Sequence, residues 1–192
     1  LWERMARISW KTYRTYLGLP GAPVEFRDRY ILSDGPAAAP PPHPPGMEFG
    51  EYMREHIPDL MSRSVEIAPE TTPFRVKTVR RNDNLQFNIA SYAHTLMADF
   101  QGLGGKLVIR EFHEFTGLKQ KVVINCTGYG ARALWKDDSV VPVRGQIGWL
   151  IPQADLNYGI IFAGVQILSR SDGVVVQDIS GGDMKGYNDD RE

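Results

Sequence analysis

The chain has 192 residues, of which 42% are hydrophobic and 23% are charged, and its formal net charge at pH 7 is −1. This balance argues against a nucleic-acid partner, because proteins of that class carry a basic excess or a basic stripe. No apolar run approaches the roughly 18 residues of a membrane-spanning helix, so we expect no membrane partner either.

The N-terminal part of the chain predicts two helices and two strands. Apolar residues recur at helical spacing over 1–18, and apolar and polar residues alternate over 24–32 and 74–81. A short helix is expected near 50–56. The proline-rich stretch 35–46 predicts an extended surface loop or linker, which we favour over a ligand for an SH3-type domain.

The middle of the chain predicts a layered α/β unit. A short strand or an entry turn is expected at 85–89, and a helix at 90–103 that ends in a glycine cluster. Strands are expected at 106–115 and 122–126, and the unbroken apolar character of the second predicts burial on both faces. A helix over 129–136 follows, which completes the order helix, strand, strand, helix.

The C-terminal part is rich in strand-forming residues. Three strands are expected at 143–151, 158–164 and 171–179, separated by turns that contain proline, asparagine or glycine. No internal repeat is visible.

Cys126 is the only cysteine, so the sequence excludes an internal disulfide and a cysteine-based metal cluster. Because it follows an apolar run, we expect Cys126 to be a buried packing residue and not a nucleophile.

His113 and Glu114 fall on opposite faces of a predicted strand, and no histidine stands four residues from either His94 or His113, so we expect no metal site. Compartment is not settled by these features, and the cytoplasm is favoured over the periplasm.

The stretch VVINCTGYGARAL, residues 122–134, has the outline of a dinucleotide-binding turn: an apolar strand, then Gly128 and Gly130, then a helical pattern. A full fingerprint also has an acidic residue about 20 positions later. Positions 148 and 149 are glycine and tryptophan. The stretch therefore fails as a primary phosphate-binding loop and fits a secondary contact with a nucleotide held mainly by other residues.

This stretch, together with PVRGQIGWL at 142–150, resembles the D-amino-acid oxidase family of FAD-dependent oxidoreductases. The helix that begins near residue 88 and the segment ILSRSDGVVVQDISGGD extend the resemblance over roughly 84–182. The family implies a discontinuous FAD domain of nucleotide-binding type and a substrate domain with a large antiparallel sheet. We therefore expect an α/β plus α+β fold, divided into 1–83 (substrate domain), 84–138 (FAD domain, with the strands 106–115 and 122–126) and 139–192 (substrate-domain strands).

The resemblance also implies which residues contact the cofactor. Thr127 and Gly128 are expected at the strand end that touches FAD, Phe112 at a position whose backbone contacts the adenine side, and Cys126 as a packed neighbour of that contact. The family's primary glycine motif and its C-terminal FAD motif are not found in these 192 residues. We therefore expect this chain by itself to bind FAD weakly or not at all, and to be inactive alone.

The expected activity is oxidation of an amino acid or amine, with hydride transfer to flavin and reoxidation by oxygen. The family carries tyrosines in its active-site strands where this chain has Phe162 and Gln166, so these two residues become candidate substrate contacts. Arg144 is either a substrate or flavin contact or a structural arginine that binds loop carbonyls. The alternatives are a flavin enzyme of the same fold that acts on another amine or a hydroxy acid, and an inactive fragment or non-enzymatic domain. No catalytic residue, substrate identity or oligomeric state follows from the sequence.

Overall fold

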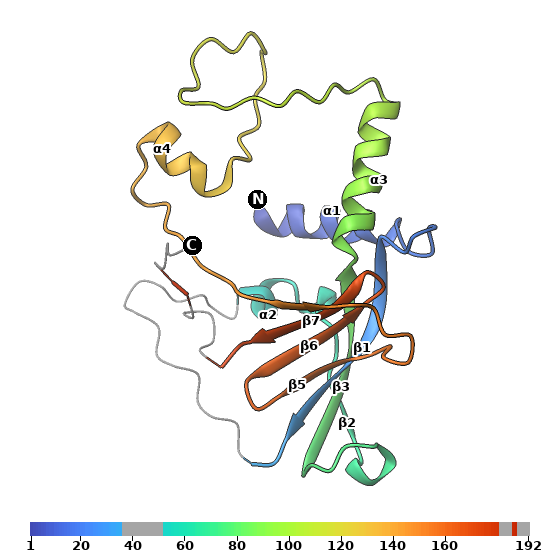
Figure 1. Ribbon diagram of the computed structural model, residues 1–192. Helices are drawn as coiled ribbons and strands as arrows, with labels where there is room; N and C mark the ends of the chain where they lie inside the picture. Colours follow the sequence, from blue (N-terminus) through green and yellow to red (C-terminus); the bar gives the residue numbers. More distant parts are fainter. Residues whose placement is uncertain (36–51, 181–185, 188–192) are drawn as a thin grey trace.

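The computed structural model describes residues 1–35, 52–180 and 186–187, and its centre is a mostly antiparallel sheet in the order β2-β3-β1-β5-β6-β7-β4 (Figure 1). The β1–β5 pair is parallel, and the other neighbours are antiparallel. The strands are β1 (Val24–Ser33), β2 (Val65–Ile67), β3 (Thr78–Phe87), β4 (Gly148–Leu150), β5 (Gly159–Phe162), β6 (Val165–Arg170) and β7 (Gly173–Asp178).

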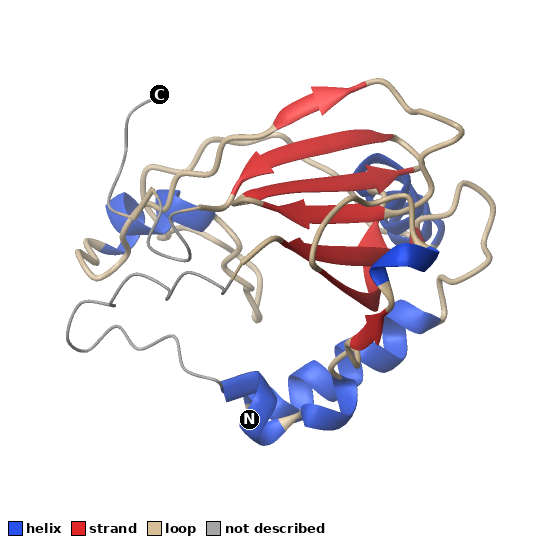
Figure 2. Ribbon diagram, turned by 90° about the horizontal axis from the view of Figure 1, so that it is seen from below, coloured by secondary structure: helices blue, strands red, loops and turns tan. Residues whose placement is uncertain are grey.

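Four helices and three 3-10 turns accompany the sheet among the described residues. Figure 2 shows the strands side by side, with the N-terminal helix running along one side of the sheet. None of the described helices combines the length and the apolar character needed to span a bilayer. The helices are α1 (Trp2–Arg14), α2 (Tyr52–His56), α3 (Ile89–Gly102) and α4 (Ala131–Trp135), and the turns are η1 (Pro58–Leu60), η2 (Pro69–Thr71) and η3 (Gly128–Gly130).

The longest strand pair, β1 with β3, organises the N-terminal part of the chain. Its register runs without interruption from Val24 opposite Phe87 to Ser33 opposite Thr78. The predicted strand at 24–32 is confirmed, whereas the strand predicted at 74–81 begins only at Thr78 and continues to Phe87. Pairing along the whole length of β1 explains the extension, because each added residue gains a cross-strand neighbour.

Aromatic side chains attach α1 to this strand pair. The ring of Trp10 lies 6.2 Å from that of Phe26, and the ring of Tyr13 lies 4.8 Å from that of Phe87, both edge to face. The helices predicted at 1–18 and 90–103 are confirmed with slightly shifted ends. Such aromatic pairs add about 0.5–1.5 kcal/mol each beyond the area that they bury.

The strands at the C-terminal end form hairpins. Three strands are predicted there, but the structure has four, because Ala163 and Gly164 both have positive φ angles (49° and 78°) and form a two-residue turn that separates β5 from β6. The strand predicted at 143–151 is confirmed only over Gly148–Leu150. The proline-rich stretch predicted as a loop, 35–46, lies outside the described residues from position 36 onward.

The two strands predicted at 106–115 and 122–126 are wrong. Both stretches are irregular and largely exposed: 97% of the Ile109 surface and 83% of the Ile124 surface is accessible. A strand needs a neighbour for its backbone hydrogen bonds, and no described segment pairs with either stretch. The mixture of helices and a mainly antiparallel sheet agrees with the predicted α and β content, but the nucleotide-binding sheet expected within 84–138 is not present among the described residues.

A buried hydrogen-bond network joins the sheet to the start of α3. Asn88 is fully buried, and its Nδ2 donates to the Ala22 carbonyl oxygen at 2.5 Å and to Glu25 Oε1 at 2.8 Å. Its Oδ1 accepts a hydrogen bond from the Ser171 N–H at 2.9 Å. Arg27 completes the network through its 3.0 Å ion pair with Glu25.

The Asn88→Ala variant should lower the free energy of unfolding by about 1–3 kcal/mol, because the Ala22 carbonyl, the Glu25 carboxylate and the Ser171 N–H would each lose the hydrogen bond that they make to this buried side chain. Urea denaturation followed by circular dichroism measures the change. The matched control is Asn84→Ala on β3, whose side chain has no hydrogen bond to the described residues and should change stability by less than about 0.5 kcal/mol. Equal effects of the two variants would contradict a special role for Asn88.

The Glu25 carboxylate should make stability depend on pH. Burial alone would raise the pKa of Glu25, but hydrogen bonds from Asn88, Arg27 and Ser171 outweigh burial and lower the pKa below its ordinary value. Its contribution is therefore present above the unfolded pKa of about 4.3 and is lost as the pH falls through the lower folded-state pKa.

The free energy of unfolding should thus fall more steeply below about pH 5 for the native chain than for Glu25→Gln. The glutamine carries no charge at any pH, so its protonation cannot contribute to the fall. Urea titrations at a series of pH values measure both slopes. Glu66→Gln, at an exposed position of β2, serves as the control and should keep the native slope. Parallel curves for the native chain and Glu25→Gln would refute the expectation.

Candidate functional site

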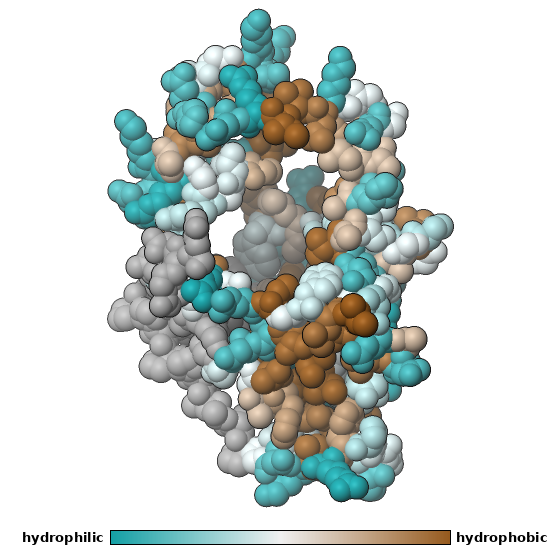
Figure 3. All heavy atoms as spheres, viewed as in Figure 1, coloured by the Kyte–Doolittle hydropathy of each residue, from teal (hydrophilic) through white to brown (hydrophobic). Residues whose placement is uncertain are grey.

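The stretch that carries the glycine motif lies in a region of its own, away from the sheet. After α3 ends, the chain runs through an extended loop and returns to η3 and α4 (Figure 1). Positive φ angles at Gly104 (87°), Gly117 (79°) and Gly128 (58°) allow the turns of this path. Figure 3 shows an opening between this upper region and the sheet below it.

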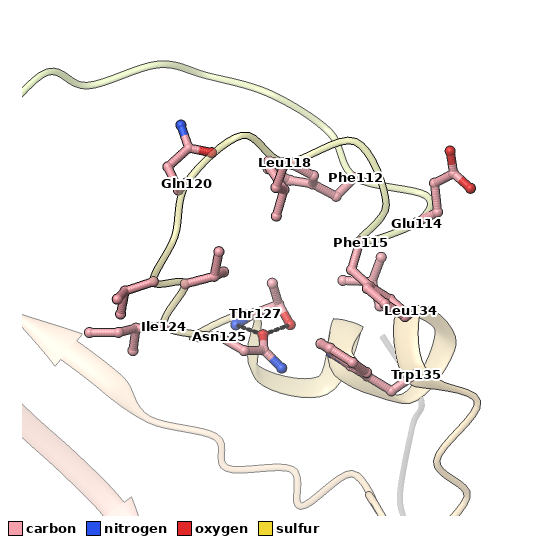
Figure 4. A pocket seen from close by; sticks show the side chains of 12 residues that line it. Phe112, Glu114, Phe115, Leu118, Gln120, Ile124, Asn125, Thr127, Leu134 and Trp135 are labelled. Carbon is pink, nitrogen blue, oxygen red and sulfur yellow. Dashed lines mark hydrogen bonds between the residues drawn. The ribbon is translucent and has the colours of Figure 1, made fainter.

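A cavity of about 330 Å³ opens inside this loop region (Figure 4). Most of its walls are apolar or aromatic, and the polar side chains are few, as is usual for sites that hold an organic ligand. The lining residues are Phe112, Glu114, Phe115, Leu118, Gln120, Val122, Val123, Ile124, Asn125, Thr127, Leu134 and Trp135.

An aromatic stack closes one side of the cavity. The ring of Phe115, from the loop, lies 4.2 Å from the ring of Trp135, from α4, and the two planes are only 10° apart. The guanidinium of Arg110 lies 4.9 Å from the centre of the Phe112 ring. The Phe115–Trp135 stack holds the loop against α4, and the Arg110–Phe112 contact lies within the loop itself.

A local hydrogen-bonded turn forms the polar side of the cavity. Asn125 Oδ1 accepts a hydrogen bond from the Thr127 N–H at 3.2 Å and another from Thr127 Oγ1 at 2.7 Å (Figure 4). The Gly130 N–H in turn donates to the Thr127 carbonyl oxygen at 3.1 Å. Asparagine forms such turns readily, so the sequence Asn-Cys-Thr-Gly positions the Thr127 hydroxyl at the cavity wall.

The structure brings two of the four predicted cofactor residues to this cavity, Phe112 and Thr127. Gly128 and Cys126 flank Thr127 along the chain and do not line the cavity. Cys126 is exposed, so the prediction that it is buried is wrong. The reason is the missing strand at 122–126, which would have provided the packing around the thiol.

The predicted substrate residues lie elsewhere. Phe162 ends β5, where 38% of its surface is accessible, and Gln166 lies on β6 just beyond the turn. Phe162 pairs with Val165, so Gln166 points to the opposite face of the sheet. Arg144 precedes β4, and its N–H donates to the Gly186 carbonyl oxygen at 3.0 Å.

Sequence reasoning missed the aromatic wall made by Phe115 and Trp135. These residues stand 20 positions apart on different elements, and their meeting depends on how the loop folds back. The one signal available beforehand was the density of aromatic and apolar residues on both sides of the glycine motif.

Comparison with known proteins gives two partial matches. The chain is 38% identical over 81 residues to a D-amino acid oxidase of Dugesia ryukyuensis, which is 40% of this chain and 24% of that protein. It is 44% identical over 59 residues to a D-amino-acid oxidase of Rubrobacter xylanophilus, which is 30% of this chain and 18% of that protein. No protein-family model matches the chain.

The chain thus spans about a quarter of the first of these relatives and about a fifth of the second. Two enzymes from distant organisms carry the same name and match at this level of identity. The matches confirm the resemblance predicted from the sequence: over the part that they cover, the chain is similar to these two D-amino-acid oxidases.

Proposed function

We propose that the chain is part of an FAD-dependent oxidoreductase that oxidises an amino acid or a related amine. The observation that carries this proposal is the pair of matches to D-amino-acid oxidases. The position of Thr127 supports it, because the motif that resembles the family's FAD-contacting strand end lies on the wall of an organic-ligand-sized cavity.

The chemistry of the cavity fits one part of FAD. A volume of about 330 Å³ suits a single ring system and is too small for the whole dinucleotide. The aromatic side chains Phe112, Phe115 and Trp135 offer surfaces on which a planar base can stack, and the Thr127 hydroxyl offers a hydrogen bond. We assign the adenine end of FAD to this cavity, with the backbone of Cys126 and Gly128 beside it.

When bound, FAD supplies the redox chemistry by accepting a hydride from the substrate. The residues of the chain then need only bind and orient. Phe162 offers an apolar surface at the tip of the β5–β6 hairpin, and Gln166 offers an amide on the other face. The Arg144 guanidinium provides positive charge near the start of β4, where a substrate carboxylate or the cofactor would be attracted.

A second candidate, oxidation of a different amine or of a hydroxy acid, is favoured by Phe162 and Gln166. The resemblance implies tyrosines at both positions, and neither a phenyl ring nor an amide can replace a phenolic hydroxyl in both hydrogen bonding and shape. The substrate's polar groups would then be recognised by other side chains, and its preferred structure would differ from that of a D-amino acid.

The full-length product of the gene should purify with the visible absorption of oxidised flavin, and the 192-residue chain alone should not. Anaerobic addition of a substrate should bleach that absorption, because flavin reduction removes it. A panel of D-amino acids, L-amino acids, simple amines and 2-hydroxy acids separates the two candidates. A full-length product without flavin, even after refolding with excess FAD, would disprove the proposal.

Thr127→Val in the full-length product should weaken FAD binding about two- to twelvefold, because it removes one hydrogen bond worth about 0.5–1.5 kcal/mol. Equilibrium dialysis against FAD measures the dissociation constant. Thr95→Val is the matched control, since the Thr95 hydroxyl donates only to the Ser91 carbonyl oxygen within α3. If the two variants bind FAD equally well, Thr127 is not a cofactor contact.

A further inference from the structure

Arg29 on β1 points to the face of the sheet opposite to the one that carries Phe26 and Phe87, and the proposed function assigns it no role. The other arginines of this Arg29 face each have a neighbouring carboxylate, and the pairs are Arg27 with Glu25 at 3.0 Å, Arg170 with Asp172 at 2.8 Å, and Arg80 opposite Glu66 in the β2–β3 register. Among the described residues, no carboxylate lies within ion-pair distance of the Arg29 guanidinium. Arg29 therefore carries a charge that the described part of the fold does not compensate.

Arg29 and Asn82 together present unused hydrogen-bond donors on this face. Arg29 is half-buried, and its Nε donates to Asn82 Oδ1 at 3.3 Å. That bond fixes the Asn82 amide and leaves its Nδ2 without a partner among the described residues, although the Nδ2 is not one of their fully enclosed unpaired atoms. The terminal nitrogens of Arg29 likewise bind no described residue. Burial lowers the pKa of Arg29, which reflects the cost of keeping its charge partly away from water.

An apolar patch borders these donors on the same face. Arg29 pairs with Gly159 of β5, and the next pair on this face is Ile31 with Ile161. Because Gly159 has no side chain, residues from both neighbouring strands reach over it. A Cβ placed on Gly159 would lie 3.6 Å from Arg29 Cγ and 3.6 Å from Leu168 Cδ2. The stem of Arg29 and the side chain of Leu168 therefore converge above the bare backbone of β5.

We propose that the Arg29 face binds a small organic carboxylate with a short, branched apolar body. The carboxylate oxygens accept hydrogen bonds from the terminal nitrogens of Arg29 and from Asn82 Nδ2. The body lies over Gly159, against Ile161 and Leu168. These groups share one face of four adjacent strands, β3, β1, β5 and β6 (Figure 1). An anion is favoured over a neutral ligand of the same shape, because it neutralises a charge that has already lost part of its hydration.

Titration of the 192-residue chain with isovalerate, followed by calorimetry and by NMR, tests the proposal. Isovalerate should bind saturably and at least about tenfold more tightly than its neutral isostere isovaleramide, a difference of about 1.4 kcal/mol. Acetate keeps the charge but lacks the branched body, so it should also bind at least about tenfold more weakly than isovalerate.

Three variants locate the ligand on the sheet. Arg29→Gln should lose at least about tenfold in isovalerate affinity. Asn82→Asp keeps the shape of the side chain and gives Arg29 a carboxylate from within the fold, so it should lose a similar factor and remain folded. Arg81→Gln is the matched control, because Arg81 lies on the opposite face of β3, 3.6 Å from Asp28, and this variant should bind within about twofold of the native chain.

Several results would overturn the proposal. These are no saturable binding of isovalerate, equal affinity for isovaleramide or acetate, undiminished binding by Arg29→Gln or by Asn82→Asp, or an equal loss in Arg81→Gln. Inorganic phosphate that binds as tightly as isovalerate would show that the apolar body is not recognised. If circular dichroism shows that Arg29→Gln does not fold, Asn82→Asp decides alone. None of these readouts involves flavin, so failure here is distinct from failure of the proposed oxidoreductase.

Discussion

The buried amide of Asn88 is the interaction on which the arrangement of the chain depends. It binds the turn before β1, the Glu25 carboxylate on β1 and the turn between β6 and β7. Its own carbonyl oxygen accepts the Tyr92 N–H at 2.8 Å and so begins α3. One residue therefore joins the β1–β3 pair to the turn between β6 and β7 and sets the direction in which α3 leaves the sheet. That direction in turn decides where the loop with the glycine motif begins.

Local patterns predicted the sheet half of the molecule well and the loop half poorly. The alternation over 24–32 correctly predicted a half-buried strand. Its backbone finds hydrogen-bond partners on β3, and each of its side chains has a cross-strand neighbour there. The apolar runs at 106–115 and 122–126 carry the same local signal, but a strand exists only where another strand accepts its hydrogen bonds. β6 was missed for a different reason: the strand predicted at 158–164 includes the two-residue turn at Ala163 and Gly164, so it ends where β6 begins.

The residues of the candidate site were likewise predicted only in part. Thr127 and Phe112 were expected from the family resemblance, and they line one cavity because the Asn125 turn and the returning loop bring them together. The aromatic wall of Phe115 and Trp135 depends on contacts between elements, which no local pattern contains. The positions of Phe162 and Gln166 were equally hidden. Only the register of the β5–β6 hairpin shows that they point to opposite faces, so that one small substrate held on one face contacts one of them directly.

Two charged side chains on the same face of β1 differ in how far the fold compensates their charge. Glu25 is held by Asn88, Arg27 and Ser171, so its charge is compensated within the fold. Arg29, four residues further along the strand, has a single hydrogen bond at 3.3 Å to a neutral amide. Burying a charge without a counterion costs stability, and no contact among the described residues repays that cost.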